Sequence, residues 1–321
     1  MTEHLKNRVM LANFMPNINL IAPIIFLLWV AMLQGCDRPE AAATELQYSL
    51  QPPSSQTVIY RFAVHPLHNP QKLSQAYQPL MQYLSEGLPH VQFELEASRD
   101  YQVFEQKIQQ EAPAFILPNP WQTLQAMTHG YEVLAVAGQN EDFKGLIIVR
   151  KDSAIKKPLD LKGKTVSYPS QTALAAAIMP QYFLHKSGLD VMNDLNNIYV
   201  GSQESSIMNV YLGHATAGAT WPPPWRSFQK SHPDQAAKLK VIWETPSLVN
   251  NSVMAHKSVP ESIKEHVKQR LLALSEQSKG GAVILEGIET AGFVAGNDQS
   301  YNKVRDYIAQ FEKEVRPVSA P

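Results

Sequence analysis

Short apolar runs alternate with amphipathic stretches along most of the chain. The run 58–64 is rich in β-branched and aromatic residues and ends at a proline-containing turn, which predicts a buried strand. Residues 71–85 place apolar side chains three and four positions apart, the spacing of a helix with one buried face. The same reasoning predicts strands over 91–95, 114–117 and 131–137, and helices over 101–110 and 121–129. This repetition of strands and helices is typical of a sheet flanked by helices.

A second block repeats the pattern, with strands expected over 145–150, 164–168, 197–200, 215–219 and 239–243. A strand over 252–255, a long helix over 260–278 and a closing helix over 301–315 follow. We therefore predict an α/β fold with two lobes, each a mixed sheet flanked by helices. Residues 58–140 and 250–321 form lobe 1, and residues 141–249 form lobe 2. Two crossings make a two-segment hinge, an architecture that holds a ligand in the cleft between lobes.

Composition excludes several function classes. Of the 321 residues, 44% are hydrophobic and 18% charged, as in ordinary globular proteins. The net charge of −1 offers no basic excess, so no nucleic-acid partner is expected. The chain has no nucleophile elbow, phosphate loop or His-Glu-x-x-His motif, so we predict neither an enzyme nor a cofactor. His65 and His68 have the spacing of a metal pair, but without a nearby third ligand we prefer a hydrogen bond to a ligand and predict no metal site.

The N-terminus predicts an address outside the cytoplasm. Lys6 and Arg8 precede an apolar segment, 18–33, that is shorter than the ~20 residues of a bilayer span. The segment ends in Leu33-Gln34-Gly35-Cys36, which resembles a bacterial lipobox. We expect a signal peptide over 1–35, lipidation of Cys36, and a proline-containing tether over 36–57 that holds the protein on the periplasmic face of a membrane. An uncleaved signal anchor is the alternative.

The stretch 159–180 combines a turn, a short strand and a helix start. Ser170, Gln171 and Thr172 supply helix-capping chemistry. Unpaired N–H groups and the helix dipole favour an anion at such a position, although an ordinary cap that binds nothing is the alternative. Ligands of α/β sheets bind at the carboxyl ends of strands. That rule adds residues that follow other predicted strands: Asn119, Trp121, Gln203, and Trp221 in the segment Trp221-Pro222-Pro223-Pro224-Trp225-Arg226. We expect Trp221 in this last segment to cover one side of the ligand and Arg226 to pair with an anion. The alternative is that the three prolines only make a rigid turn.

Taken together, these segments resemble the PhnD-like solute-binding proteins of phosphate/phosphonate ABC importers, a branch of the type 2 periplasmic-binding fold. The resemblance rests on residues 61–64, 100–101, 149–153, 159–164, 169–180, 213–220 and 239–243. It implies a small polar ligand such as a phosphonate or a phosphate-like oxyanion, and ABC permease and ATPase subunits as partners. A sensory module coupled to a membrane signalling protein is the alternative.

The resemblance also implies roles for individual residues. Tyr101 matches a tyrosine that hydrogen-bonds phosphoryl oxygens. Residues 170–173 fall where the family has Ser-Thr-Ser-Gly, Phe143 stands in place of a tyrosine, and no histidine stands near Gln203 where the family has one. The complete predicted ligand site is Tyr101, Asn119, Trp121, Phe143, Ser170, Gln171, Thr172, Gln203, Trp221 and His68.

Overall fold

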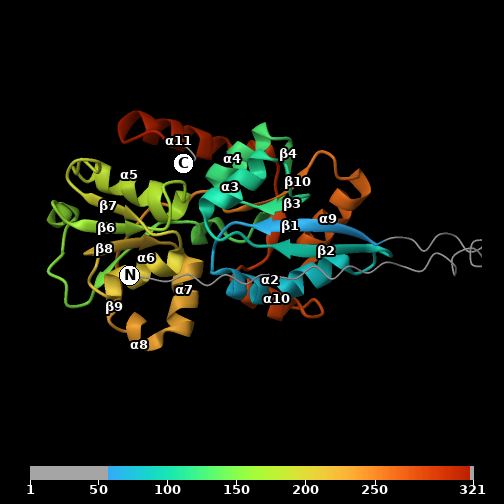
Figure 1. The fold of residues 1–321 in the computed structure, drawn as a ribbon, viewed down its shortest axis with the longest axis horizontal. Helices are drawn as coiled ribbons and strands as arrows, with labels where there is room; N and C mark the ends of the chain where they lie inside the picture. The colour runs from blue at the N-terminus through green and yellow to red at the C-terminus, as the bar shows by residue number, and fades with distance from the viewer. Residues whose placement is uncertain (1–56, 319–321) are drawn as a thin grey trace, which may run out of the picture. The chain divides into compact units, whose positions relative to one another are not determined.

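The computed structural model describes residues 57–318. The predicted signal peptide, the lipidation site Cys36 and nearly all of the predicted tether lie outside the described residues. Two mixed sheets flanked by helices make up the described part of the chain (Figure 1). This arrangement confirms the predicted fold class. Within residues 57–318, no helix combines the length and the hydrophobicity needed to cross a bilayer.

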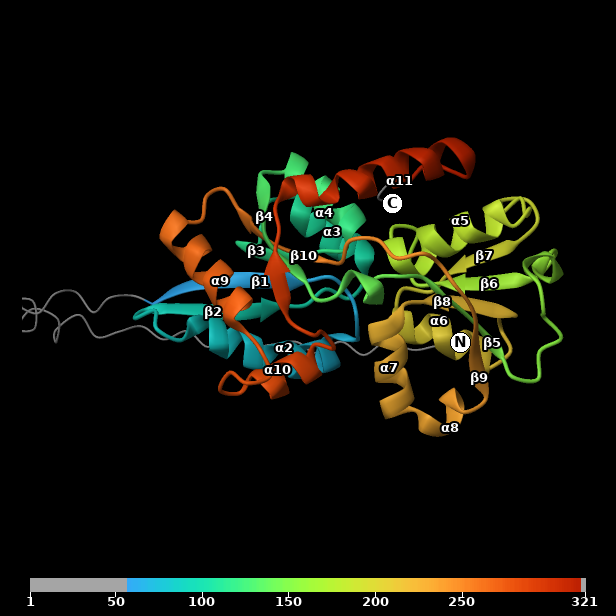
Figure 2. The ribbon, with the colours of Figure 1, turned by 180° about the vertical axis from the view of Figure 1, so that it is seen from behind.

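The first sheet and its helices are called lobe 1 below. The sheet has the order β11-β4-β10-β3-β1-β2, and it is mixed because β1 pairs parallel with β2 and β3 whereas β10 runs antiparallel to β3 and β4. Its strands are β1 (Val58–Val64), β2 (Val91–Glu96), β3 (Phe115–Leu117), β4 (Tyr131–Ala137), β10 (Ser252–His256) and β11 (Phe293–Ala295). The helices are α2 (Pro70–Ser85), α3 (Tyr101–Gln109), α4 (Pro120–Thr128), α9 (Glu261–Ala273), α10 (Gly281–Gly287) and α11 (Asn302–Glu314). Helices α2, α9 and α10 pack together, and α3, α4 and α11 lie on the other side of the sheet (Figures 1 and 2).

The second sheet and its helices are called lobe 2. The strand order is β7-β6-β8-β5-β9, with β6 parallel to β7 and β8, and β5 antiparallel to β8 and β9. The strands are β5 (Leu146–Arg150), β6 (Thr165–Tyr168), β7 (Asn196–Tyr199), β8 (Ala217–Thr220) and β9 (Leu239–Glu244). The helices are the π-helical turn η4 (Leu174–Ile178), α5 (Met179–Lys186), α6 (Gln203–Tyr211), α7 (Pro222–Ser231) and α8 (Pro233–Ala236). Helix α5 lies on the same side as α11, and α6 to α8 lie on the opposite side (Figure 2).

The two segments that cross between the sheets are hydrogen-bonded to each other. The Ala137 N–H donates to the Asn251 carbonyl at 2.8 Å, and the Thr245 N–H donates to the Gly145 carbonyl at 2.9 Å. Between them, the Leu248 N–H donates to the Phe143 carbonyl at 3.0 Å. The crossings therefore run side by side.

Elements of both lobes differ from the sequence-based expectation. The segment after β8, for which a rigid turn is one expectation, is the first turn of α7; proline is tolerated there because the first N–H groups of a helix have no intrahelical acceptor. The helix predicted over 260–278 ends at Ala273, because Leu274 is extended. Gly280, with φ +74°, then begins the unpredicted helix α10, and the short strand β11 was not predicted either.

Candidate functional site

A small cavity lies between the two lobes. Residues from both sheets and from the two crossings contribute to it. Its lining consists of His65, Tyr101, Asn119, Phe143, Ala173, Leu174, Ala175, Ala176, Gln203, Trp221 and Asn251. Five of the ten predicted ligand residues are in this set: Tyr101, Asn119, Phe143, Gln203 and Trp221. Predicted residues from five separate segments of the chain therefore meet at one cavity.

Tyr101 connects the two lobes at the edge of this cavity. The Gln203 side-chain amide, at the start of α6, donates to the Tyr101 hydroxyl oxygen at 3.0 Å. Gln203 is itself held by the Thr220 hydroxyl, which donates to its amide oxygen at 2.9 Å. Burial raises the pKa of the Tyr101 phenol, so the hydroxyl keeps its proton. Since its oxygen already accepts from Gln203, Tyr101 has its own O–H left to donate to a ligand.

Asn119 caps helix α4 and also contacts lobe 2. Its side-chain oxygen accepts from the Trp121 and Gln122 N–H groups at 3.0 and 3.1 Å, and its side-chain nitrogen donates to the Thr172 carbonyl at 3.2 Å. A cap and an inter-lobe contact therefore use both ends of this amide. Its role at the cavity is to fix the position of the Thr172 backbone.

Backbone N–H groups supply the donors on the lobe 2 side. Ala173 is still extended, with φ −72° and ψ 96°, so the helical turn starts only at Leu174. The N–H groups of Leu174, Ala175 and Ala176 have no acceptor among residues 57–318. Pro180 has no N–H to give the Ala176 carbonyl, and the turn widens into a π-helix at this point. Three free donors at the positive end of a helix form a site for an anion.

Gly145 allows this turn to lie close to the crossing segment. A Cβ atom at position 145 would be 2.7 Å from the Ala175 carbonyl oxygen and 2.8 Å from Pro180. Only glycine fits such a close approach without displacing the turn. The conformation of the donor-bearing turn therefore depends on a residue of the crossing.

Three polar residues predicted to contact the ligand lie beside the cavity rather than in its lining. The Thr172 hydroxyl donates to the buried carboxylate of Glu105 at 2.5 Å, and the Ser170 and Thr172 hydroxyls are 3.0 Å apart. The side chain of Gln171 is exposed, and its carbonyl accepts from Arg316 at 2.8 Å. These groups hold the lobes and the helix start together.

Glu105 is the centre of that support. It is 4% exposed, and it accepts from the Gln122 side chain at 2.9 Å as well as from Thr172. Its second carboxylate oxygen is buried without a hydrogen-bond partner. Burial raises the pKa of this carboxyl, and the two hydrogen bonds oppose that shift.

Two of the remaining predicted residues form an aromatic wall of the cavity, and the other two lie outside the lining. Phe143 and Trp221 pack with ring centroids 5.4 Å apart and close one side of the cavity. Trp121 is buried beside Glu105 along a different hollow, and His68 is half-buried outside the cavity lining. Arg226 faces away from the cavity: its guanidinium donates to both Asp142 oxygens at 3.0–3.1 Å and lies 3.3 Å from Glu289.

Sequence reasoning expected free N–H donors at this helix start but placed the contacts at residues 170–172 instead of 173–176; it kept His68 and not His65 in the final ligand set, and it missed Asn251. His65 and Asn251 follow or precede strands of lobe 1, so the strand-end rule offered a signal for them. His65 ends β1, and its Nδ1 donates to the Leu117 carbonyl at 2.9 Å. Asn251 stands immediately before β10 and is 3% exposed.

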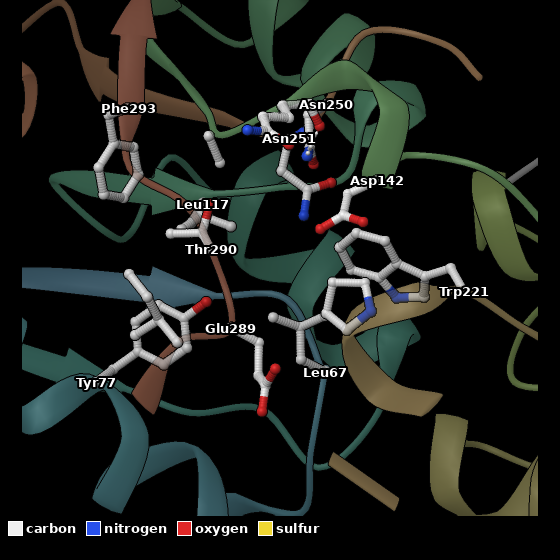
Figure 3. Close-up of a pocket in the computed structure, with 14 residues that line it drawn as sticks. Leu67, Tyr77, Leu117, Asp142, Trp221, Asn250, Asn251, Glu289, Thr290 and Phe293 are labelled. Carbon is white, nitrogen blue, oxygen red and sulfur yellow. Dashed lines mark hydrogen bonds between the residues drawn. The ribbon is translucent and has the colours of Figure 1, made fainter. Parts of the chain in front are cut away.

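A second cavity shares Trp221 and Asn251 with the first, and the residues that line it are drawn in Figure 3. Leu67, Tyr77, Leu117 and Phe293 make its apolar wall. Its acidic residues, Asp142 and Glu289, are already paired with Arg226, which joins α7 of lobe 2 to the loop before β11. This cavity therefore offers space beside the ligand site without a free charge of its own.

Two lobes joined by paired crossings, with donors from both around one small cavity, define a solute-binding protein of the type 2 periplasmic fold. A family profile described as "ABC transporter, phosphonate, periplasmic substrate-binding protein" matches residues 62–301. The chain belongs to this family, as the sequence resemblance predicts.

Known proteins agree with this assignment. The probable ABC transporter phosphite binding protein PhnD1 of Prochlorococcus marinus (strain MIT 9301) is 24% identical over 186 residues, 54% of this chain. The match covers 63% of that relative, less than two thirds of its length. A binding-protein component of an ABC phosphonate transporter from Pseudomonas aeruginosa superposes with a TM-score of 0.74 at 15% identity, covering 81% of this chain and 88% of that one. The structure of PhnD1 from Prochlorococcus marinus in complex with methylphosphonate superposes with a TM-score of 0.72 at 19% identity, covering 80% of this chain and 100% of that one.

Proposed function

We propose that this protein binds a small phosphonate or a related phosphorus oxyanion between its lobes and delivers it to the membrane subunits of an ABC importer. The observation that carries the proposal is the set of free N–H groups at residues 174–176, which face the same cavity as the Tyr101 hydroxyl. Donors converging from both lobes would bind the oxygens of an oxyanion only when the lobes are together. Closure about the paired crossings is therefore part of the proposal.

Family membership and the names of the relatives support this ligand class. One relative is named for phosphite, and one structure holds methylphosphonate. The second cavity beside Trp221 leaves room for a substituent. Membership in a family of substrate-binding proteins supports a transport role without chemistry of its own. Lipid anchoring at Cys36 on the extracytoplasmic face completes the proposal, since a tethered receptor stays near its permease.

The direct test is calorimetric titration of ligand-free protein with methylphosphonate, phosphite, phosphate and sulfate. We expect one site per chain and stabilisation of about 2.7 kcal/mol at a ligand concentration of 100 Kd. Tyr101→Phe removes one hydroxyl donor and should weaken the best ligand about 10- to 100-fold, because a hydrogen bond to a charged group contributes about 1.5–3 kcal/mol. Tyr211→Phe, at the far end of α6, is the matched control. If none of the phosphorus oxyanions binds, the proposal is wrong.

A further inference from the structure

Two hydrogen-bond acceptors face the ligand cavity, in addition to its donors. The Nδ1–H of His65 donates to the Leu117 carbonyl at 2.9 Å, so a neutral imidazole presents Nε2 as an acceptor. Nε2 has no partner among residues 57–318. His65 is 1% exposed and lines the cavity.

Asn251 supplies the second acceptor. Its side-chain oxygen Oδ1 is buried without a hydrogen-bond partner within the described residues. Asn251 lines both cavities, and Figure 3 shows it among the residues of the second. A buried acceptor without a donor costs about 1–3 kcal/mol, and a ligand that carries a proton would remove that cost.

The cavity has no cationic side chain to balance a second negative charge. None of its lining residues is Lys or Arg. An acidic group, Glu105, is held against Thr172 just outside the lining. A doubly charged anion would be buried here among neutral dipoles and near the Glu105 carboxyl group. Its burial is therefore much less favourable than that of a singly charged anion.

We propose that the cavity selects an oxyanion that still carries a proton, such as a hydrogen phosphonate monoanion, whose P–OH donates to His65 Nε2 or Asn251 Oδ1. The free N–H groups of residues 174–176 and the Tyr101 hydroxyl bind its unprotonated oxygens. This inference rests on the proposed function, and it adds the protonation state of the ligand and the two residues that recognise it. A dianion would set an unprotonated oxygen against two acceptors.

Other titratable groups near His65 must be separated from the ligand's own proton. They are Tyr101 and Glu105 of α3, His68 on the following loop, and Lys72 of α2 beside His68. Burial lowers the pKa of His65 to about 4, so its Nε2 stays an acceptor throughout the neutral range. Burial raises the pKa of Glu105, which makes this carboxyl the protein group whose titration needs a control.

The experiment is a calorimetric titration of the ligand-free full chain with methylphosphonate, across the second ionisation of that ligand. We expect the Kd to be level below this ionisation and to rise about tenfold per pH unit above it, because only the monoanion fraction binds. Methanesulfonate, a monoanion of similar shape without a proton, should bind more weakly and with no such slope. The same slope should persist in Glu105→Gln, since the ligand and not the protein titrates.

Two variants test the acceptors. His65→Phe and Asn251→Leu should each weaken methylphosphonate about 10- to 100-fold and leave methanesulfonate nearly unchanged. His214→Gln, an exposed residue of lobe 2, is the control. A Kd for methylphosphonate that stays constant or falls as the dianion forms would overturn the inference and leave the proposed function standing. Failure of methylphosphonate to bind at any pH would remove both.

Discussion

Replacing Thr172 by valine tests whether the lobes are held together by the contact that the structure shows. Valine keeps the shape of threonine but removes the hydroxyl that donates to Glu105 at 2.5 Å. The bond joins two lobes, so it contributes only when they are together. A hydrogen bond to a charged group contributes about 1.5–3 kcal/mol, which predicts a ligand Kd weakened about 10- to 150-fold.

The assay is calorimetric titration of the ligand, paired with thermal unfolding of the ligand-free protein. The Asn119 amide still donates to the Thr172 carbonyl, so the helix start should keep its position. Thr128→Val is the matched control, because that hydroxyl donates to the Gln125 carbonyl at the exposed end of α4. In a Glu105→Gln background the Thr172→Val change should cost less, since its partner is then neutral. The reasoning is refuted if Thr172→Val leaves both the Kd and the unfolding temperature unchanged.

Three further predictions concern pH, packing and the membrane. Burial raises the pKa of Glu105 above its value in the unfolded chain, so the stability that its protonated form contributes is lost as the pH rises through the folded-state pKa. Calorimetry at a series of pH values should therefore show that Glu105→Gln unfolds at a higher temperature than wild type above the folded-state pKa. Below the unfolded-state pKa the two proteins should unfold at similar temperatures. Gly145→Ala places a Cβ 2.7 Å from the Ala175 carbonyl, and it should destabilise the protein by about 1–3 kcal/mol in chemical denaturation and weaken the ligand, whereas equal affinity would show that the turn tolerates movement. Cys36→Ala should release the protein from the membrane fraction and remove the lipid mass in mass spectrometry, and retention on the membrane would favour the uncleaved anchor.

Strand positions were predictable because apolar runs must be buried. The predicted bounds 58–64 and 131–137 coincide with β1 and β4. Helix α7 was not predicted because three prolines normally interrupt a helix, and only at its first turn do their missing N–H groups cost nothing. The helix predicted after β10 was too long, because the apolar spacing continues past Ala273 although the helix ends there. The backbone then forms a turn at 275–278.

Residues that follow strands could be predicted in part as candidate ligand contacts, but their hydrogen-bond partners within the protein could not. Arg226 was a reasonable candidate for an anion, yet Asp142 and Glu289 lie far from it in sequence and take both sides of its guanidinium. His65 and His68 were equivalent by sequence. Only the fold shows that the Leu117 carbonyl fixes the tautomer of His65 and leaves its second nitrogen at the cavity.

Free N–H donors at this helix start of lobe 2 were predicted, but the residues that carry them were not, for a physical reason. Any residue provides a backbone N–H, so Leu174, Ala175 and Ala176 have no sequence signature as ligand contacts. Their availability depends on where the helix begins, and Ala173 delays that start beyond the hydroxyl residues. Where the family has Ser-Thr-Ser-Gly this chain has Ser170-Gln171-Thr172-Ala173, and the three N–H donors that follow still lack an acceptor within residues 57–318. In this chain the hydroxyl of Thr172 donates to Glu105, and the donors that we propose for the anion belong to three residues whose side chains are apolar.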